Sequence, residues 1–153
     1  MLAGPTDMSS AAARERAFTA ELREAGLDAV DRPVVRHGLT HADGGRGWAQ
    51  LMALRERPTA VFCTSDAVAV GLLNACHEQG VAPPAVVGFD NSPVSSWSTF
   101  ALTTVDTHLS TMARTASAML VRRLAELADG HDAPARRTVV PTELVVRRSH
   151  VVA

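Results

Sequence analysis

The segment that decides the fold is Thr59-Ala-Val-Phe-Cys-Thr64, a continuous apolar run of strand length. It is followed by Ser65-Asp66 and by a helical segment that ends before Gly80. A second continuous run, Ala85-Val-Val-Gly-Phe89, comes directly after the next turn. Strands that are apolar along their whole length are typical of sheets buried on both faces. Their alternation with helices predicts an α/β fold with a doubly wound parallel sheet.

The same alternation of helices and strands extends through the rest of the chain. Gly26 and Gly80 are typical helix stops, and Pro58 ends a helix before it. Ser9 or Ser10 is expected to cap the first helix, and Gly38–Gly45 is expected to be a polar loop. Helices are predicted over about 9–25, 45–57, 66–79 and 108–129, and strands over 1–4, 34–36, 59–64, 85–89, 102–105, 139–140 and 144–146.

Composition limits the classes of protein that the chain can represent. It has 153 residues, 46% of them hydrophobic, which predicts a folded domain, and a net charge of −1 gives no basic surface for nucleic acid. Its two cysteines, Cys63 and Cys76, form no CxxC motif, which favours a reducing compartment. The sequence shows no secretion signal and no apolar stretch of membrane-spanning length. We therefore expect a cytoplasmic protein without a membrane partner.

Polar side chains that follow the predicted strands are candidates for ligand binding, because ligands of doubly wound sheets lie beyond the carboxyl ends of the strands. Arg14 can donate a forked pair of hydrogen bonds, and the Asp90 carboxylate can accept from two hydroxyl groups. Such a pair suits a small polar ligand. Arg14 can equally be a surface residue, and Asp90 can be an Asx-turn residue. Asp66 is interpreted as a helix N-cap. Trp97 can stack on a sugar ring or take part in packing.

Motifs for catalysis, metal binding and nucleotide binding are not found in the sequence. There is no Gly-x-Ser-x-Gly elbow, no Walker loop and no GxGxxG motif. His37 and His41 lie in a predicted loop without a third ligand, which argues against zinc. We expect no enzyme activity, no metal and no cofactor.

An ordered set of segments resembles the LacI/GalR family of transcription regulators. The segments cover residues 3 to 149 in the family's order and at nearly its spacing. They are Ser10–Leu22, which resembles the family's S-x-x-R-x-x-G-F-x-x-A-L segment, Pro58–Asp66 with Ala69 and Gly71, Gly80-Val-Ala-Pro, Val86-Val-Gly-Phe-Asp90, Leu102-Thr-Thr-Val105, and Pro141-Thr-Glu-Leu-Val-Val-Arg147.

The resemblance implies one part of a sensor with two lobes of periplasmic-binding-protein type behind a helix-turn-helix head. Residues 1–106 would be the second lobe with a truncated first strand. Residues 107–150 would be a crossing segment, a long helix and terminal strands that belong partly to the first lobe. The head and most of the first lobe would lie outside this sequence. The apolar stripe on helix 108–129 would then be uncovered, and the chain alone would be marginally stable, aggregation-prone or dimeric.

The resemblance also implies roles for individual residues. Arg14 corresponds to the arginine that holds effector hydroxyls, and Asp90 to the carboxylate that receives sugar hydroxyls. Ser65 stands where asparagine is usual, and Thr107 where glutamine often follows the LTTV segment. Thr40 or Leu39 lies near a position where an aromatic residue faces the ligand in relatives.

The expected function is effector binding, with a sugar as ligand, in a homodimeric regulator that contacts operator DNA only through its head. Two other interpretations remain open. One is a fragment of a periplasmic-type solute-binding protein, which would need a secretion signal. The other is a small flavodoxin-like or hydrolytic enzyme, which would need a phosphate loop or a nucleophile elbow.

Overall fold

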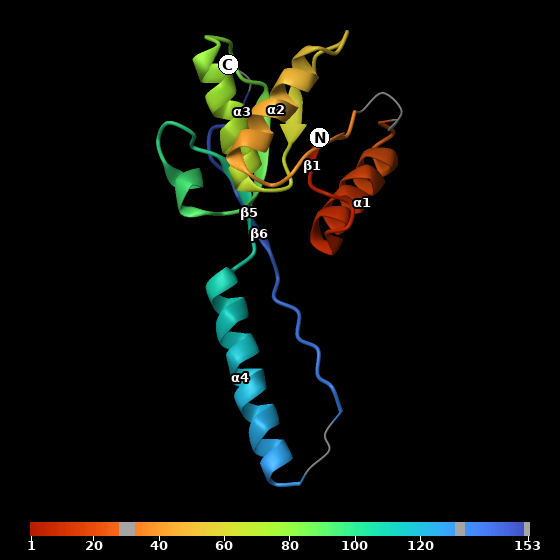
Figure 1. Ribbon diagram of the computed structural model, residues 1–153, viewed down its shortest axis with the longest axis vertical. Coiled ribbons are helices and arrows are strands. Elements are labelled where there is room, and N and C mark those ends of the chain that lie inside the picture. Colours follow the sequence, from red (N-terminus) through yellow and green to blue (C-terminus); the bar gives the residue numbers. More distant parts are fainter. Residues whose placement is uncertain (28–32, 131–133, 152–153) are drawn as a thin grey trace.

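The computed structural model describes residues 1–27, 33–130 and 134–151. Its body is a β-sheet with helices on both faces, and one long helix extends away from this body (Figure 1). No helix in the described ranges is long and apolar enough to cross a membrane. The elements are β1 (Leu2–Ala3), α1 (Ser9–Glu24), β2 (Val35–Arg36), α2 (His41–Met52), β3 (Ala60–Phe62), α3 (Asp66–Glu78), β4 (Ala85–Asp90), the 3-10 helix η2 (Pro93–Ser96), β5 (Thr103–Asp106), α4 (Leu109–Ala128) and β6 (Glu143–Val145).

The sheet is parallel except for its last strand. β1 and β2 pair in parallel, and β3, β4 and β5 form a second parallel set. A parallel bridge between Leu2 and Cys63 joins the two sets, so β1 lies between β2 and β3. β6 pairs antiparallel with β5. The predicted α/β class with a parallel, doubly wound sheet is confirmed.

One face of the sheet carries the hydrophobic core. Val61, Cys63 and Val86 point to this face and are almost fully buried under α2 and α3. The two helices cross very closely because Gly44 of α2 meets Gly71 of α3. A Cβ on Gly44 would lie 2.9 Å from the Gly71 Cα, so the crossing requires glycine.

The opposite face is covered only in part, by α1. Phe18 of α1 stacks on Phe62 of β3 with ring centroids 5.3 Å apart. Along β4, however, Val86 and Gly88 are buried whereas Val87 and Phe89 are half-buried. The expectation that the strands are buried on both faces is therefore wrong for β4, because α1 is a single helix.

Several local predictions need correction. α2 begins at His41, inside the expected Gly38–Gly45 loop, because Thr40 and Asp43 form a capping box. The N-cap of α1 is Met8 and makes no side-chain hydrogen bond, so neither Ser9 nor Ser10 is the cap. Residues 139–140 form no strand.

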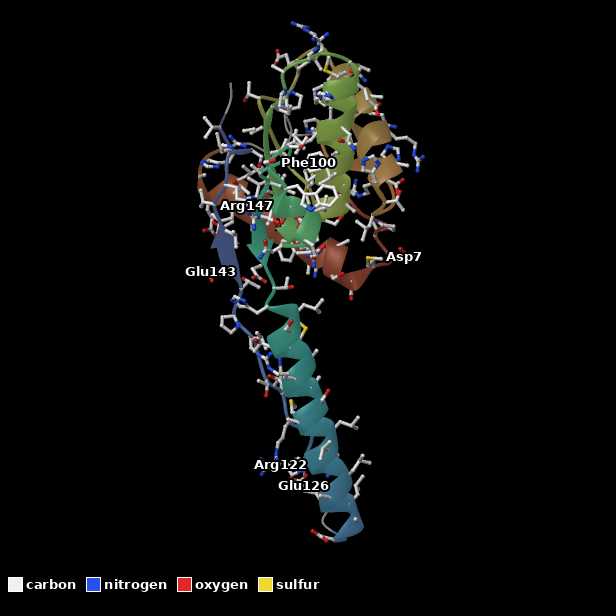
Figure 2. All side chains as sticks on the ribbon, turned by 90° about the vertical axis from the view of Figure 1, so that its left-hand side faces the viewer. Asp7, Phe100, Arg122, Glu126, Glu143 and Arg147 are labelled. Atoms are coloured by element: carbon white, nitrogen blue, oxygen red, sulfur yellow. The ribbon has the colours of Figure 1, made fainter. Side chains whose placement is uncertain are left out.

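α4 and residues 134–142 extend together from one end of the body (Figure 1). Figure 2 shows Glu143 at the neck of this extension and Arg122 and Glu126 far along it. Glu126 pairs with Arg122 at 3.1 Å and with Arg136 at 2.9 Å, which ties the returning chain to the helix. None of the residues of α4 is buried. Its exposed large apolar side chains are Leu109, Met112, Leu120, Val121, Leu124 and Leu127.

Candidate functional site

A cationic and an anionic side chain meet at the carboxyl edge of the parallel strands. Arg14 comes from the second turn of α1, and Asp90 is the last residue of β4. Arg14 Nη2 lies 3.4 Å from Asp90 Oδ1. The structure thus brings together the two residues predicted to hold ligand hydroxyls.

The Arg14 guanidinium is fixed by three neighbours. Nη1 donates a hydrogen bond of 2.6 Å to the carbonyl oxygen of Thr64, two residues beyond β3. The guanidinium also lies over the Phe89 ring, with Cζ 3.7 Å from the ring centroid, a cation–π geometry. Asp90 provides the third contact. Arg14 is therefore held in place before any ligand arrives, which lowers the entropy lost on binding.

Asp90 lies in a turn with an unusual backbone. Its φ is 114°, and that of Asn91 is 49°, so both residues lie in a region that non-glycine residues seldom adopt. Burial raises the pKa of the Asp90 carboxyl, the charge of Arg14 opposes this shift, and the charge of Asp66 adds to it. Asp90 keeps 43% of its side-chain surface exposed and can accept hydrogen bonds from a ligand.

Asp66 holds this turn from inside the protein. The sequence suggested that Asp66 is the N-cap of α3, and this interpretation is wrong. The N-cap is Ser65, whose hydroxyl accepts from the Val68 amide at 3.3 Å. Asp66 is only 1% exposed. Its Oδ2 accepts from the amide of Ser92 at 2.7 Å and from its hydroxyl at 3.0 Å, and its Oδ1 accepts from Thr104 Oγ1 at 2.5 Å.

The other predicted site residues occupy different surroundings. Ser65 is buried, with its hydroxyl engaged in the cap, and Thr40 is the cap of α2, bonded to Asp43. Thr107 lies half-buried between β5 and α4. Trp97 is 61% exposed and stacks on Phe100 after η2. The green segment that contains η2 lies on the opposite side of the body from α1 in Figure 1. The structure therefore groups Arg14 with Asp90 and leaves Trp97 apart from them.

Three residues connected to the Asp90 turn, namely Asn91, Asp106 and Arg147, were not expected from the sequence to contribute to the site. Asn91 bonds to Asp106 at the end of β5 and to Arg147 after β6. The position of Asn91 directly after Asp90 was a usable signal. The contacts of Asp106 and Arg147 depend on pairing between β5 and β6, which no local pattern specifies.

An apolar hollow of about 380 Å³ lies beside Arg14, between α1 and the sheet. The rings of Phe18, Phe62 and Phe89 line it, together with Ala17. Arg14 thus stands between a polar edge and an apolar recess. Among the described residues, no group of three or more His, Cys, Asp or Glu side chains has the arrangement needed for a metal ion.

Comparison with known proteins agrees with this architecture. Residues 1–150 match the family described as periplasmic binding protein-like domain. The HTH-type transcriptional repressor PurR of Escherichia fergusonii is 32% identical over 127 residues, which are 81% of this chain and 37% of that protein. The PurR of Salmonella paratyphi B gives the same identity and coverage.

Solved structures show the same fold. A regulator from Sanguibacter keddieii assigned to the LacI family superposes with a TM-score of 0.85 at 32% identity, covering 98% of this chain and 57% of that one. The lac repressor dimer bound to operator and an anti-inducer gives a TM-score of 0.82 at 25% identity, covering 99% of this chain and 44% of the other.

A parallel sheet with helices on both faces and one antiparallel last strand places the chain in the class of α/β domains. Within that class, the chain belongs to the family of periplasmic binding protein-like domains, in the form that LacI/GalR-type regulators carry as their effector-binding portion. It spans 37% of the length of the curated relatives that it matches.

Proposed function

We propose that this chain is the effector-binding portion of a LacI/GalR-type transcription regulator, and that its effector is a sugar. The observation that carries the proposal is the pairing of Arg14 with Asp90 at the carboxyl edge of the sheet. The guanidinium offers donors to ring or hydroxyl oxygens, and the carboxylate accepts from adjacent hydroxyls. The half-buried Phe89 ring under Arg14 offers an apolar surface to the ring of the sugar.

The regulator as a whole would act by coupling effector binding to DNA binding. A sugar that binds one arrangement of two lobes better than another shifts the population toward that arrangement. The operator contact would come from a helix-turn-helix head outside this chain, in a cytoplasmic homodimer. Similarity to PurR and to the lac repressor dimer supports this assignment.

Thermal unfolding in the presence of sugars tests the ligand class. D-ribose, D-glucose and D-galactose are the sugar probes, and adenine and guanine represent nucleobases. A sugar present at about 100 times its Kd should raise Tm by about 8 °C, because binding stabilises the folded state by about 2.7 kcal/mol. Asp90→Ala and Arg14→Ala should each remove this rise, since each takes away one half of the pair.

Arg16→Ala and Asp7→Ala are matched controls, because both residues are exposed and lie outside the pair. Both variants should keep the full sugar response. The proposal is wrong if no sugar raises Tm, or if Asp90→Ala responds as the unchanged chain does. A response to adenine or guanine alone would replace the sugar with a nucleobase effector.

We further propose that α4 and residues 134–142 pack against the first lobe of the longer regulator. The support is that none of the residues of α4 is buried, although the helix carries six large apolar side chains. The chain also covers only 57% of the LacI-family regulator from Sanguibacter keddieii. Without the first lobe, the apolar side chains of α4 should drive association.

Substitution of three of these side chains tests the uncovered helix. The triple variant Leu120→Gln, Leu124→Gln, Leu127→Gln should shift the chain toward monomer in size-exclusion chromatography with light scattering. Its thermal midpoint should change little, because the three residues make no part of the core. Ser110→Gln with Ser117→Gln, on the same helix, should leave the association unchanged. Equal association of both variants would contradict the proposal.

A further inference from the structure

The turn that carries Asp90 continues into Asn91, whose side chain lies between two segments that lead out of the body. These crossing segments are residues 106–108, which connect β5 to α4, and residues 143–147, which bring the chain back. Asn91 Nδ2 donates to Asp106 Oδ2 at 3.0 Å, and Arg147 Nη2 donates to Asn91 Oδ1 at 2.8 Å. One amide group therefore contacts both crossing segments.

Asp106 and Arg147, the two partners of Asn91 in the crossing segments, are anchored further. Arg147 Nη1 donates to the carbonyl oxygen of Leu102 at 2.7 Å and lies 3.2 Å from Ser95 Oγ. Figure 2 shows Arg147 inside the body, above Glu143 at the neck. Asp106 Oδ1 accepts from the backbone amide of His108 at 2.6 Å. A displacement of the Asn91 side-chain amide would therefore move both crossing segments.

The chemistry of this position requires an amide side chain. Asp106 offers a carboxylate, which accepts, and Arg147 offers a guanidinium, which donates. A short amide satisfies both with one donor and one acceptor. Asn91 also tolerates the left-handed φ of 49° better than most residues, and its backbone amide donates to Thr104 Oγ1 at 3.3 Å. Asparagine therefore suits both the backbone conformation and the side-chain hydrogen bonds at this position.

We propose that Asn91 is a positioning residue that couples the ligand-facing carboxylate of Asp90 to the two crossing segments. The coupling rests on the proposed function, because it assigns a consequence to ligand binding at Asp90. A ligand hydroxyl that draws the Asp90 carboxylate outward moves the adjacent Asn91 amide. Asp106 and Arg147 then shift with it, and the motion reaches the extension formed by α4 and its return.

The first test needs no ligand and follows the carboxyl carbon of Asp106 by NMR during a pH titration. The pKa of Asp106 is lowered by the hydrogen bond from the His108 amide and by that from the Asn91 side chain. Charged and titratable groups around it are Asp90, His108, Glu143 and Arg147. Asn91→Gly keeps the left-handed backbone and removes the side-chain bonds to Asp106, Arg147 and Ser95, so the Asp106 midpoint should move upward.

Two more variants make the test specific. Asn91→Asp retains an acceptor for Arg147 but places a second carboxylate beside Asp106, so it should raise the midpoint further than Asn91→Gly does. Ser92→Gly removes the neighbouring side chain, which bonds to Asp66 and to neither crossing segment, and should leave the midpoint unchanged. A simple loosening of the turn would move all three variants alike and would overturn the proposal.

The second test measures backbone amide hydrogen exchange of residues 143–147 with and without D-ribose, D-glucose or D-galactose. A sugar that binds should change exchange in this segment of the wild-type chain. In Asn91→Gly the sugar should still raise Tm, but the change at 143–147 should be lost. If no sugar binds, the proposed function is wrong. The Asp106 titration still shows whether Asn91 is connected to the crossing segment that contains Asp106. An unchanged midpoint in Asn91→Gly, or a retained exchange response, overturns the coupling.

Discussion

Gly44→Ala should unfold the chain about 10 °C earlier than the unchanged sequence, from a loss of about 3 kcal/mol. The added Cβ would lie 2.9 Å from the Gly71 Cα and from the Leu72 amide nitrogen, and closer still to the Val68 carbonyl oxygen. These are backbone atoms of a neighbouring helix, so no side-chain rotation relieves the clash. α2 would have to move off α3, and the core beneath both helices would open. Differential scanning calorimetry measures the shift.

Gly45→Ala provides the matched control, because it is the next residue of the same helix. A Cβ there meets nothing closer than 4.0 Å. Alanine is favoured over glycine in a helix by about 1 kcal/mol, so this variant should unfold slightly later. Opposite signs for two adjacent glycine-to-alanine changes would show that close approach of the helices, and not helix propensity, decides the effect. A similar midpoint for both variants would contradict the close crossing.

The alternation of apolar strands with helices was sufficient to predict the parallel sheet and most of its elements. It predicted β3 and β4 within a few residues, because each is a continuous apolar run between clear turn or helix signals. The start of α2 was missed, since Gly44 and Gly45 look like loop residues. Glycine occurs at position 44 because of tertiary packing, since a Cβ there would clash with the backbone of α3.

The candidate site was predictable only where resemblance or a strand end pointed to it. Arg14 and Asp90, 76 residues apart in sequence, do meet in the structure. The role of Asp66 was misjudged, because a carboxylate that starts a helix is ordinarily a cap. Its side chain turns inward to Ser92 and Thr104, which are contributed by two other segments. Contacts of this kind depend on sheet order and have no local signature.

Removal of the Asp66 carboxylate should have the other large effect on stability. Asp66→Ala leaves the buried Thr104 hydroxyl and the half-buried Ser92 amide and hydroxyl without their acceptor. We expect a loss of about 3 kcal/mol, since each unsatisfied buried donor costs about 1–3 kcal/mol and hydroxyls can partly rotate to other partners. The urea midpoint should fall by about 1.5 M at an m-value of about 2 kcal/mol per M.

Asp66→Asn separates the hydrogen bonds from the charge. Its amide oxygen still accepts from Ser92, so the loss of stability should be smaller than for Asp66→Ala. The pKa of Asp90 is raised first by burial and also by the negative charge of Asp66. Removing that charge should therefore lower the titration midpoint of Asp90, followed by NMR of its carboxyl carbon. Asp90 would then remain ionised, and able to accept sugar hydroxyls, to lower pH. A midpoint that rises instead would mean that the turn has closed over Asp90 and buried it more deeply.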